Sequence, residues 1–551
     1  MLTLDWIVLG AFVLGLVAFI VISMRSRDKT SSDYFLAGRD ATWIAIGASI
    51  FASNIGSEHL VGLAGAGASS GMAMAHWEIQ GWLILMLGWL FVPFYARSGV
   101  FTMPEFLEKR YNKGSRSVLS IISLVSYVLT KVAVTVYAGG VVFKDVFGIE
   151  SIWGIDFFWI SAIGLVVITG IYTALGGMRA VLWTSVIQTP VLLIGSIAVL
   201  ITGLIKVGGW DELMHICRAV PVNEYGDTMT QLIRSPKDPV YPWSGVLLGS
   251  AIIGFWYWCT DQYIVQRVLS GRDQTQSRRG AIFGASLKLT PVFIFLIPGM
   301  IAYALNQKGI ITLASSDSAF STLVKELLPL GFKGLVVGGL LAALMSSLAS
   351  LFNSSAALFT IDFYTRFKPK ASENELVRVG RIATIVVVIL GILWIPVMKG
   401  IGKVLYAYLQ DVQSILAPGI AAAFLLGILS KKVTPAAGLT GLLTGFIIGM
   451  FRLIFTIFKT FLNADTIIYR VFVEANWLHY EIINFAICIV VMIVVSYFTP
   501  KIDERKITGL YLGSATAEQK ALTRASWNKW DVIASGFVIV VIIAFYAYFW
   551  N

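Results

Sequence analysis

Residues 41–70, ATWIAIGASIFASNIGSEHLVGLAGAGASS, have the length and apolar character of a membrane helix that is broken in its middle. The interruption is the polar run SNIGSEH, residues 53–59. An unsatisfied polar group in hydrocarbon is costly, so such a run persists only where it faces a cavity, a partner or a ligand. Broken membrane helices commonly form binding sites, and we expect this break to lie at the functional centre.

The composition indicates a polytopic, all-α integral membrane protein whose surroundings are the lipid bilayer. Of its 551 residues 57% are hydrophobic and 13% are charged, and the mean hydropathy is +0.79. The net charge of +11 comes from basic residues in short loops between apolar runs, which the positive-inside rule explains. We therefore expect no nucleic-acid partner. The three cysteines are too few and too scattered to predict a disulfide framework or a metal site.

About fourteen runs are long enough to cross a bilayer. The first, residues 4–23, is followed by basic residues without a cleavage site, which predicts a retained span with both termini of the chain outside. The expected spans are residues 4–23, 41–70, 72–96, 118–143, 153–175, 180–205, 243–266, 280–306, 332–361, 379–398, 404–429, 433–458, 475–499 and 530–550.

These spans group into two similar sets of five. Residues 41–206 and 243–430 each begin with an interrupted span, the second one near Gly254 and the run TDQ, residues 260–262. Because five is odd, the second set enters the membrane from the opposite side, which predicts an inverted repeat. Residues 1–40 add a helix and a cytoplasmic loop, residues 207–242 an extracellular loop, and residues 431–551 three further helices with a cytoplasmic linker.

Few strongly polar groups lie at membrane depth, and they alternate with Trp and Tyr. Carboxylates, amides, an ammonium and an imidazole suit the hydroxyls of a sugar or polyol ring, while aromatic faces suit its C–H groups. A buried salt bridge that only fastens helices is the alternative for Glu78 and Lys288, and Lys131 can simply pair with a neighbour. The polar groups are Asn54, Glu58, His59, Glu78, Lys131, Asp261, Gln262, Lys288, Gln410 and Asp411.

Ser346 and Ser347 form a second polar site, within the span 332–361. Their hydroxyls, together with carbonyls freed by the helix break at Ala52 and Ile55, offer the neutral oxygen ligands that suit Na⁺. Serine pairs in membrane helices also bond to the preceding turn or to a neighbouring helix, so this pattern alone does not decide between the two roles.

Four stretches closely resemble the sodium/glucose cotransporters of the sodium:solute symporter family. They are DYFLAGR (33–39), GASIFASNIGS (47–57), WYWCTDQ (256–262) and LMSSL (344–348). The resemblance spans nearly the whole chain and implies a leucine-transporter-like five-plus-five inverted repeat with extra helices at both ends.

The resemblance also implies roles for individual residues. Tyr257 would close the inner side of the pocket, and Leu63, Trp77 and Tyr406 would form the outer gate. The Na⁺ site would take the carbonyls of Ala52, Ile55 and Ala343 and the hydroxyls of Ser346 and Ser347. The implied sugar contacts are Asn54, His59, Glu78, Tyr257, Trp258, Lys288 and Gln410.

One departure from the family pattern concerns a second ion. Relatives that use two Na⁺ are thought to rely on an Asp where this chain has Ser185, and on hydroxyls near Ala349 and Ser350, of which Ala349 has none. Losing an acid and a hydroxyl removes the charge that would offset dehydration of a second cation. We therefore expect one Na⁺ per sugar. Gly254 and Gly81 also suggest a roomier or wetter pocket.

The expected function is Na⁺-coupled uptake of glucose or galactose by alternating access, carried out by a monomer in the cell membrane. Transport of myo-inositol or another small solute, coupling to H⁺ through Glu58 or Glu78, and an uncoupled sugar sensor or sodium channel stay open. An enzyme is not expected, since the four histidines lack metal-ligand spacing and no nucleophile motif is present. The sequence assigns no role to Glu58.

Overall fold

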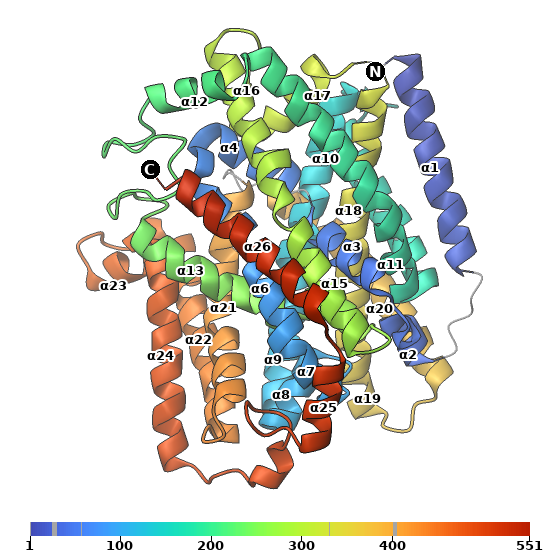
Figure 1. The fold of residues 1–551 in the computed structure, drawn as a ribbon, viewed down its shortest axis with the longest axis vertical. Coiled ribbons are helices and arrows are strands. Elements are labelled where there is room, and N and C mark those ends of the chain that lie inside the picture. The colour runs from blue at the N-terminus through green and yellow to red at the C-terminus, as the bar shows by residue number, and fades with distance from the viewer. Residues whose placement is uncertain (1, 25–29, 57, 330, 400–404, 551) are drawn as a thin grey trace.

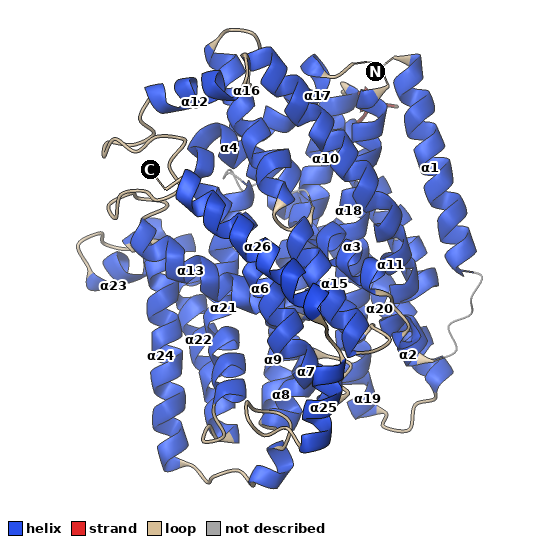
Figure 2. Cartoon of the chain, in the orientation of Figure 1, coloured by secondary structure: helices blue, strands red, loops and turns tan. Residues whose placement is uncertain are grey.

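The computed structural model describes residues 2–24, 30–56, 58–329, 331–399 and 405–550. Within these residues nearly all regular structure is helical (Figure 2), and the strands form one hairpin of β1, Ser151–Ile152, and β2, Ile155–Asp156. Ten helices of the described residues are long and apolar enough to cross a membrane. The predicted number of about fourteen stays a prediction, because the expected spans 153–175 and 180–205 are counted together as α11, Phe157–Val207, although the chain kinks between them.

The first half of the chain follows the predicted order of spans. Its last helix, α11, turns sharply at Gly177, where φ is 51° and ψ is −150°. Its other helices are α3 Trp43–Asn54, α4 Ala64–Ser70, α5 Ala75–Glu78, α6 Gly81–Met86, α7 Val92–Ser98, α8 Met103–Arg110, α9 Lys113–Ser126 and α10 Ala133–Phe147.

The second half repeats this order, and further helices flank both halves. The second half comprises α13 Trp243–Phe255, α14 Gln262–Leu269, α15 Gln274–Leu287, α16 Ile297–Gln307, α17 Ala319–Leu327, α18 Phe332–Ala357, α19 Thr365–Phe367, α20 Glu373–Lys399 and α21 Leu405–Leu429. The remaining helices are α1 Thr3–Met24, α2 Ser31–Leu36, α12 Trp210–Ala219, α22 Pro435–Ile457, α23 Ile467–Tyr469, α24 Trp477–Phe498, α25 Ala517–Ala525 and α26 Lys529–Tyr548.

Both predicted helix breaks are present. At the end of α3, Ile55 leaves the helical conformation with φ −78° and ψ 98°, and the chain continues in a π-helical segment, η2, Glu58–Leu63, before α4. At the second break the π-helical segment η6, Trp256–Thr260, is followed by Asp261, whose side chain caps α14. π-helical turns often occur at functional sites, because they redirect side chains within a helix.

The two halves interlock around these breaks. Helix α3 packs against α15 of the second half, and α14 of the second half packs against α7 of the first. Helix α18 packs against both α3 and α11. Each broken helix therefore contacts elements of the other half, which places both breaks near the centre of the molecule (Figure 1).

The extracellular loop predicted at residues 207–242 folds back onto the helices. The Met72 N–H donates to the carbonyl of Met229 at 2.8 Å, and the Leu232 N–H donates to the carbonyl of Phe549 at 2.9 Å. Burial opposes ionisation of Asp238 in this loop, but two backbone N–H groups and Arg234 outweigh it and lower the pKa of the carboxyl. This loop is thus an ordered cover over its end of the helices.

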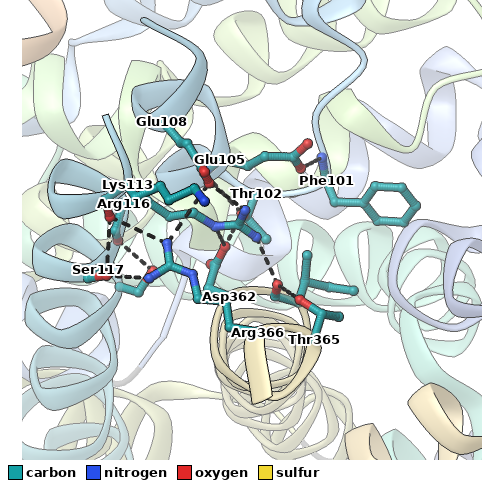
Figure 3. A network of polar contacts seen from close by, with 12 residues as sticks. Phe101, Thr102, Glu105, Glu108, Lys113, Arg116, Ser117, Asp362, Thr365 and Arg366 are labelled. Atoms are coloured by element: carbon teal, nitrogen blue, oxygen red, sulfur yellow. Dashed lines mark hydrogen bonds and ion pairs between the residues drawn. The ribbon is translucent and has the colours of Figure 1, made fainter. Parts of the chain in front are cut away.

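The opposite end of the molecule carries α8, α19 and α25, at the bottom of Figure 1, while both chain termini lie in its upper half. A charged network fastens this lower end (Figure 3). Arg116 forms ion pairs with Asp362 at 2.6 Å and with Glu108 at 2.7 Å, and the Thr102 hydroxyl donates to Asp362 at 3.0 Å. The network joins α8 and α9 to the π-helical segment η9, Leu358–Tyr364.

Close packing of α4 against α16 generates a stability prediction. A Cβ on Gly299 would lie 2.0 Å from the carbonyl oxygen of Ala64, so we expect Gly299→Ala to force the helices apart and to cost about 1–3 kcal/mol. A Cβ on Gly164 of α11 would have no atom within 4 Å, which makes Gly164→Ala the control. Thermal unfolding of the purified protein in detergent measures both, and equal stability of the two variants would contradict this packing.

Candidate functional site

A cavity of about 40 Å³ lies between the two broken helices. This volume is below that of typical small-ligand sites, about 300–1,000 Å³, so a solute the size of a sugar would have to widen the cavity. All seven predicted substrate contacts line it, although they come from α3, η2, α5, η6, α21 and the C-terminal end of α15. The lining residues are Asn54, Glu58, His59, Trp77, Glu78, Gln80, Ile253, Gly254, Tyr257, Trp258, Lys288, Gln410 and Gln413.

A buried polar network occupies one wall of this cavity. The Lys288 ammonium lies 2.5 Å from the Glu78 carboxylate and donates to the Asn54 side-chain oxygen at 2.9 Å. His59 approaches the same carboxylate at 3.2 Å, and the Asn54 amide donates to the Tyr257 hydroxyl at 3.1 Å. Because Glu78 and Lys288 are paired, two opposite charges are held at membrane depth without a large desolvation penalty for either one alone.

The aromatic wall of the cavity comes from the second broken helix. The rings of Tyr257 and Trp258 meet edge to face, with centroids 4.8 Å apart, and the Lys288 ammonium lies 5.3 Å from the centroid of Trp258. Polar groups on one side and aromatic surfaces on the other form an amphipathic pocket. Such a pocket can hold a small ring with many hydroxyls.

The sequence analysis missed two amide side chains that line the cavity. Gln80 accepts from the Trp258 indole N–H at 3.3 Å and donates to the carbonyl of Ser250 at 2.7 Å. A Cβ on Gly254 would lie 2.3 Å from the Gln80 side-chain oxygen, so this amide fills the space that Gly254 was expected to leave open. Gln413 follows Gln410 by three residues, a helical spacing that could have revealed it.

The expected gate residues occupy different environments. Trp77 lines the cavity and stacks on Trp477, with ring centroids 5.7 Å apart. Leu63 is fully buried at the end of η2 and does not line the cavity. Tyr257 lines this cavity and a second one beside it. The side chain of Tyr406 lies outside the described part of the chain.

The predicted Na⁺ ligands lie on two helical regions that pack against each other, α18 and the end of α3. The Ser347 hydroxyl donates to the carbonyl of Ser53 at 3.2 Å, and Tyr263 donates to the same carbonyl. The hydroxyls of Ser346 and Ser185 lie 3.2 Å apart. Ala52, Ile55 and Ala343 are buried in the same two helical regions. The structure thus brings together oxygen donors suited to a hard monovalent cation.

The second cavity lies between the first cavity and these hydroxyls, and an ion pair borders it. The Lys131 ammonium lies 2.5 Å from the Asp261 carboxylate, as the structural alternative for Lys131 predicted. The cavity has about 280 Å³ of empty space. Its lining residues are Glu58, Lys131, Val134, Thr135, Tyr257, Tyr263, Ser347, Leu351 and Gln413.

Comparisons with known proteins place this site in context. A sequence model of the family described as "Sodium:solute symporter family" matches residues 34–445. The chain is 38% identical to sodium/glucose cotransporter 1 of Oryctolagus cuniculus, over 88% of this chain and 77% of that protein. It is 35% identical to sodium/glucose cotransporter 4 of Danio rerio, over 95% of this chain and 83% of that protein. It is 37% identical to the sodium/myo-inositol cotransporter of Homo sapiens, over 78% of this chain and 64% of that protein.

Solved structures show the same fold. A Na⁺-coupled sialic acid symporter superposes with a TM-score of 0.74 at 21% identity, over 90% of this chain and 98% of that one. The transporter MhsT, solved in complex with L-phenylalanine, superposes with a TM-score of 0.50 at 15% identity, over 83% and 98%. The predicted leucine-transporter-like fold is confirmed.

The buried pair of Glu78 and Lys288 generates a prediction on stability. Glu78→Gln leaves the Lys288 ammonium without its counter-charge, so we expect a loss of about 3–5 kcal/mol. Adding Lys288→Met should restore much of this loss, because the double variant buries no unpaired charge. Glu105→Gln, which breaks the half-exposed pair of Glu105 and Lys109, is the control and should cost about 0–1 kcal/mol. Thermal unfolding in detergent that shows Glu78→Gln to be as stable as this control would refute the expectation.

Proposed function

Because the chain belongs to the sodium:solute symporter family, we propose that it carries glucose or galactose into the cell together with one Na⁺ per sugar. Membership makes it a multi-pass sodium-coupled solute symporter, a transporter and not an enzyme, with Na⁺ as the coupling ion. The observation that carries the sugar assignment is the cavity that unites all seven expected contacts.

The chemistry of the cavity favours a neutral, hydroxyl-rich solute. Its one ammonium, Lys288, is already matched by Glu78, so a carboxylate-bearing solute would find no spare positive charge on this side chain. Amides of Asn54 and Gln410 offer both donors and acceptors, and Trp258 offers an aromatic surface. The similarity to a sodium/myo-inositol cotransporter makes myo-inositol the second candidate.

Coupling would arise because one helix break serves both ligands. Asn54 and His59 face the sugar cavity, while the carbonyl of the neighbouring Ser53 accepts from the Ser347 hydroxyl of α18 at 3.2 Å. An ion bound there would fix the end of α3 and thereby orient Asn54 for the sugar. Rocking of the two halves around this centre would then expose both ligands to the cytoplasm, with Tyr257 as the inner gate.

The ratio of one Na⁺ per sugar rests on the surroundings of Ser185. Its hydroxyl donates to the carbonyl of Val181 at 2.7 Å and lies 3.4 Å from the Ser49 hydroxyl, so it takes part in a neutral cluster. Ala349 adds no oxygen on its side chain. Neither position carries a carboxylate, so the cost of dehydrating a second cation is not offset there.

We further propose that a single chain suffices for transport, because both cavities lie between the two halves of this chain and take lining residues from each half. The division into residues 41–206 and 243–430 as two inverted repeats is supported by the matching breaks of α3 and α13. Placement of both termini outside the cell agrees with their common position in the upper half of Figure 1.

Uptake of sugar into proteoliposomes tests the two sites separately. We expect uptake of labelled glucose or galactose to require an inward Na⁺ gradient and to be inhibited by the other sugar. Ser346→Ala should raise the Na⁺ concentration for half-maximal uptake about tenfold. Gln410→Ala should lower the affinity for the sugar by a similar factor. Ser161→Ala, which removes a hydroxyl of α11 that bonds to its own helix, is the control. Uptake that needs no Na⁺ would refute the proposal, and unchanged sugar affinity in Gln410→Ala would refute the pocket.

Parallel fluxes of labelled Na⁺ and labelled sugar test the coupling ratio. We expect a ratio of one in the natural protein. Ser185→Asp combined with Ala349→Thr restores an acid and a hydroxyl and should move the ratio toward two, whereas Ala349→Thr alone should leave it at one. A ratio of two in the unaltered chain would contradict the argument from Ser185.

A further inference from the structure

Glu58 is the one carboxylate that faces both cavities. It is the first residue of η2, and it lines the sugar cavity together with His59 and the second cavity together with Ser347. Among the described residues its carboxylate forms no salt bridge, and the hydrogen bond it accepts comes from its own backbone N–H. A carboxylate without a salt-bridge partner beside a buried polar cavity needs a counter-charge.

The space beside Gly56 brings the Glu58 carboxylate close to the hydroxyl of Ser347. A Cβ on Gly56 would lie 2.4 Å from the Glu58 Oε2 atom and 3.0 Å from the Ser347 Oγ atom. Both oxygens therefore pack against Gly56, where any side chain would collide with the Glu58 carboxylate. The Ser347 hydroxyl also reaches the carbonyl of Ser53 at 3.2 Å, at the end of α3.

The cations near Glu58 are engaged elsewhere. The Lys131 ammonium lies 2.5 Å from Asp261, and the Lys288 ammonium lies 2.5 Å from Glu78. His59 approaches Glu78 at 3.2 Å. The negative charge of Glu58 therefore has no salt-bridge partner and can attract a mobile cation.

We propose that the Glu58 carboxylate supplies the negative charge that holds the transported Na⁺, from the side of the second cavity. This rests on the proposed function, and it adds a charged group to a site otherwise built from neutral oxygens. Carboxylate, hydroxyl and carbonyl oxygens together suit a hard monovalent cation. Because His59 follows Glu58 directly, an ion that draws the carboxylate inward also positions the imidazole in the sugar cavity.

Glu58→Gln removes the charge while it keeps the length of the side chain and its ability to form hydrogen bonds. We expect the Na⁺ affinity of this variant to fall about tenfold or more. Tryptophan fluorescence of the purified protein, titrated with Na⁺ in the absence of sugar, measures this affinity. The Na⁺ concentration for half-maximal uptake should rise by the same factor. At saturating Na⁺ the sugar affinity should change less than about threefold, since the lost charge faces the ion.

Two variants make this test specific to the charge of Glu58. Glu58→Asp keeps the charge and should retain Na⁺ affinity within about threefold. Glu481→Gln alters a carboxylate that is fully buried on α24 and lines neither cavity, and it should bind Na⁺ as the natural chain does.

Unchanged Na⁺ affinity in Glu58→Gln would overturn the inference, and so would a loss in Glu58→Asp as large as that in Glu58→Gln. Both results differ from failure of the proposed function, which would appear as Na⁺-independent uptake in the natural chain.

Discussion

The structure depends on hydrogen bonds to the backbone groups that lose their helical partners where a membrane helix is broken. Where α3 ends, carbonyl groups lose their helical partners in a region without bulk water, and each must find another donor. Ser347 and Tyr263 both donate to the carbonyl of Ser53, and they come from the second half of the chain. At the other break, the Lys131 ammonium of the first half pairs with Asp261 at 2.5 Å, and the Tyr127 hydroxyl accepts from the Tyr263 N–H at 3.0 Å. Each break is therefore held by groups that the other half supplies.

This mutual support explains why ion, sugar and conformation are linked in one centre. Tyr263 connects the two breaks directly, because its backbone N–H lies at the second and its hydroxyl reaches the first. A cation that took ligands at the end of α3 would enter the same network of hydrogen bonds. Binding there can shift the balance between arrangements of the two halves only to the extent that the ligands fit one arrangement better than the other.

The sequence was sufficient for the two breaks and for seven of the side chains that line the cavity, because polar groups in hydrocarbon are few and each needs a reason. It was less informative where contacts join distant segments. Gln80 occupies the space beside Gly254, and Trp77 stacks on Trp477, and neither pairing has a local signal in the chain. Leu63 matched the pattern of a gate residue, yet its side chain is buried away from the cavity, since the direction of η2 after the break sets where it points.

The pair of Lys131 and Asp261 shows how this centre can hold charge without admitting water from the lower end. The Lys131 ammonium lies 4.7 Å from the ring centroid of Tyr263 and 4.8 Å from that of Tyr257. Aromatic faces stabilise an ammonium in place of a hydration shell, so the ion pair remains favourable in a dry environment. Since Tyr257 also lines the sugar cavity, a movement of this ring would remove part of that stabilisation and would open both cavities together. Movement of Tyr257 is therefore opposed by the loss of its contact with the Lys131 ammonium.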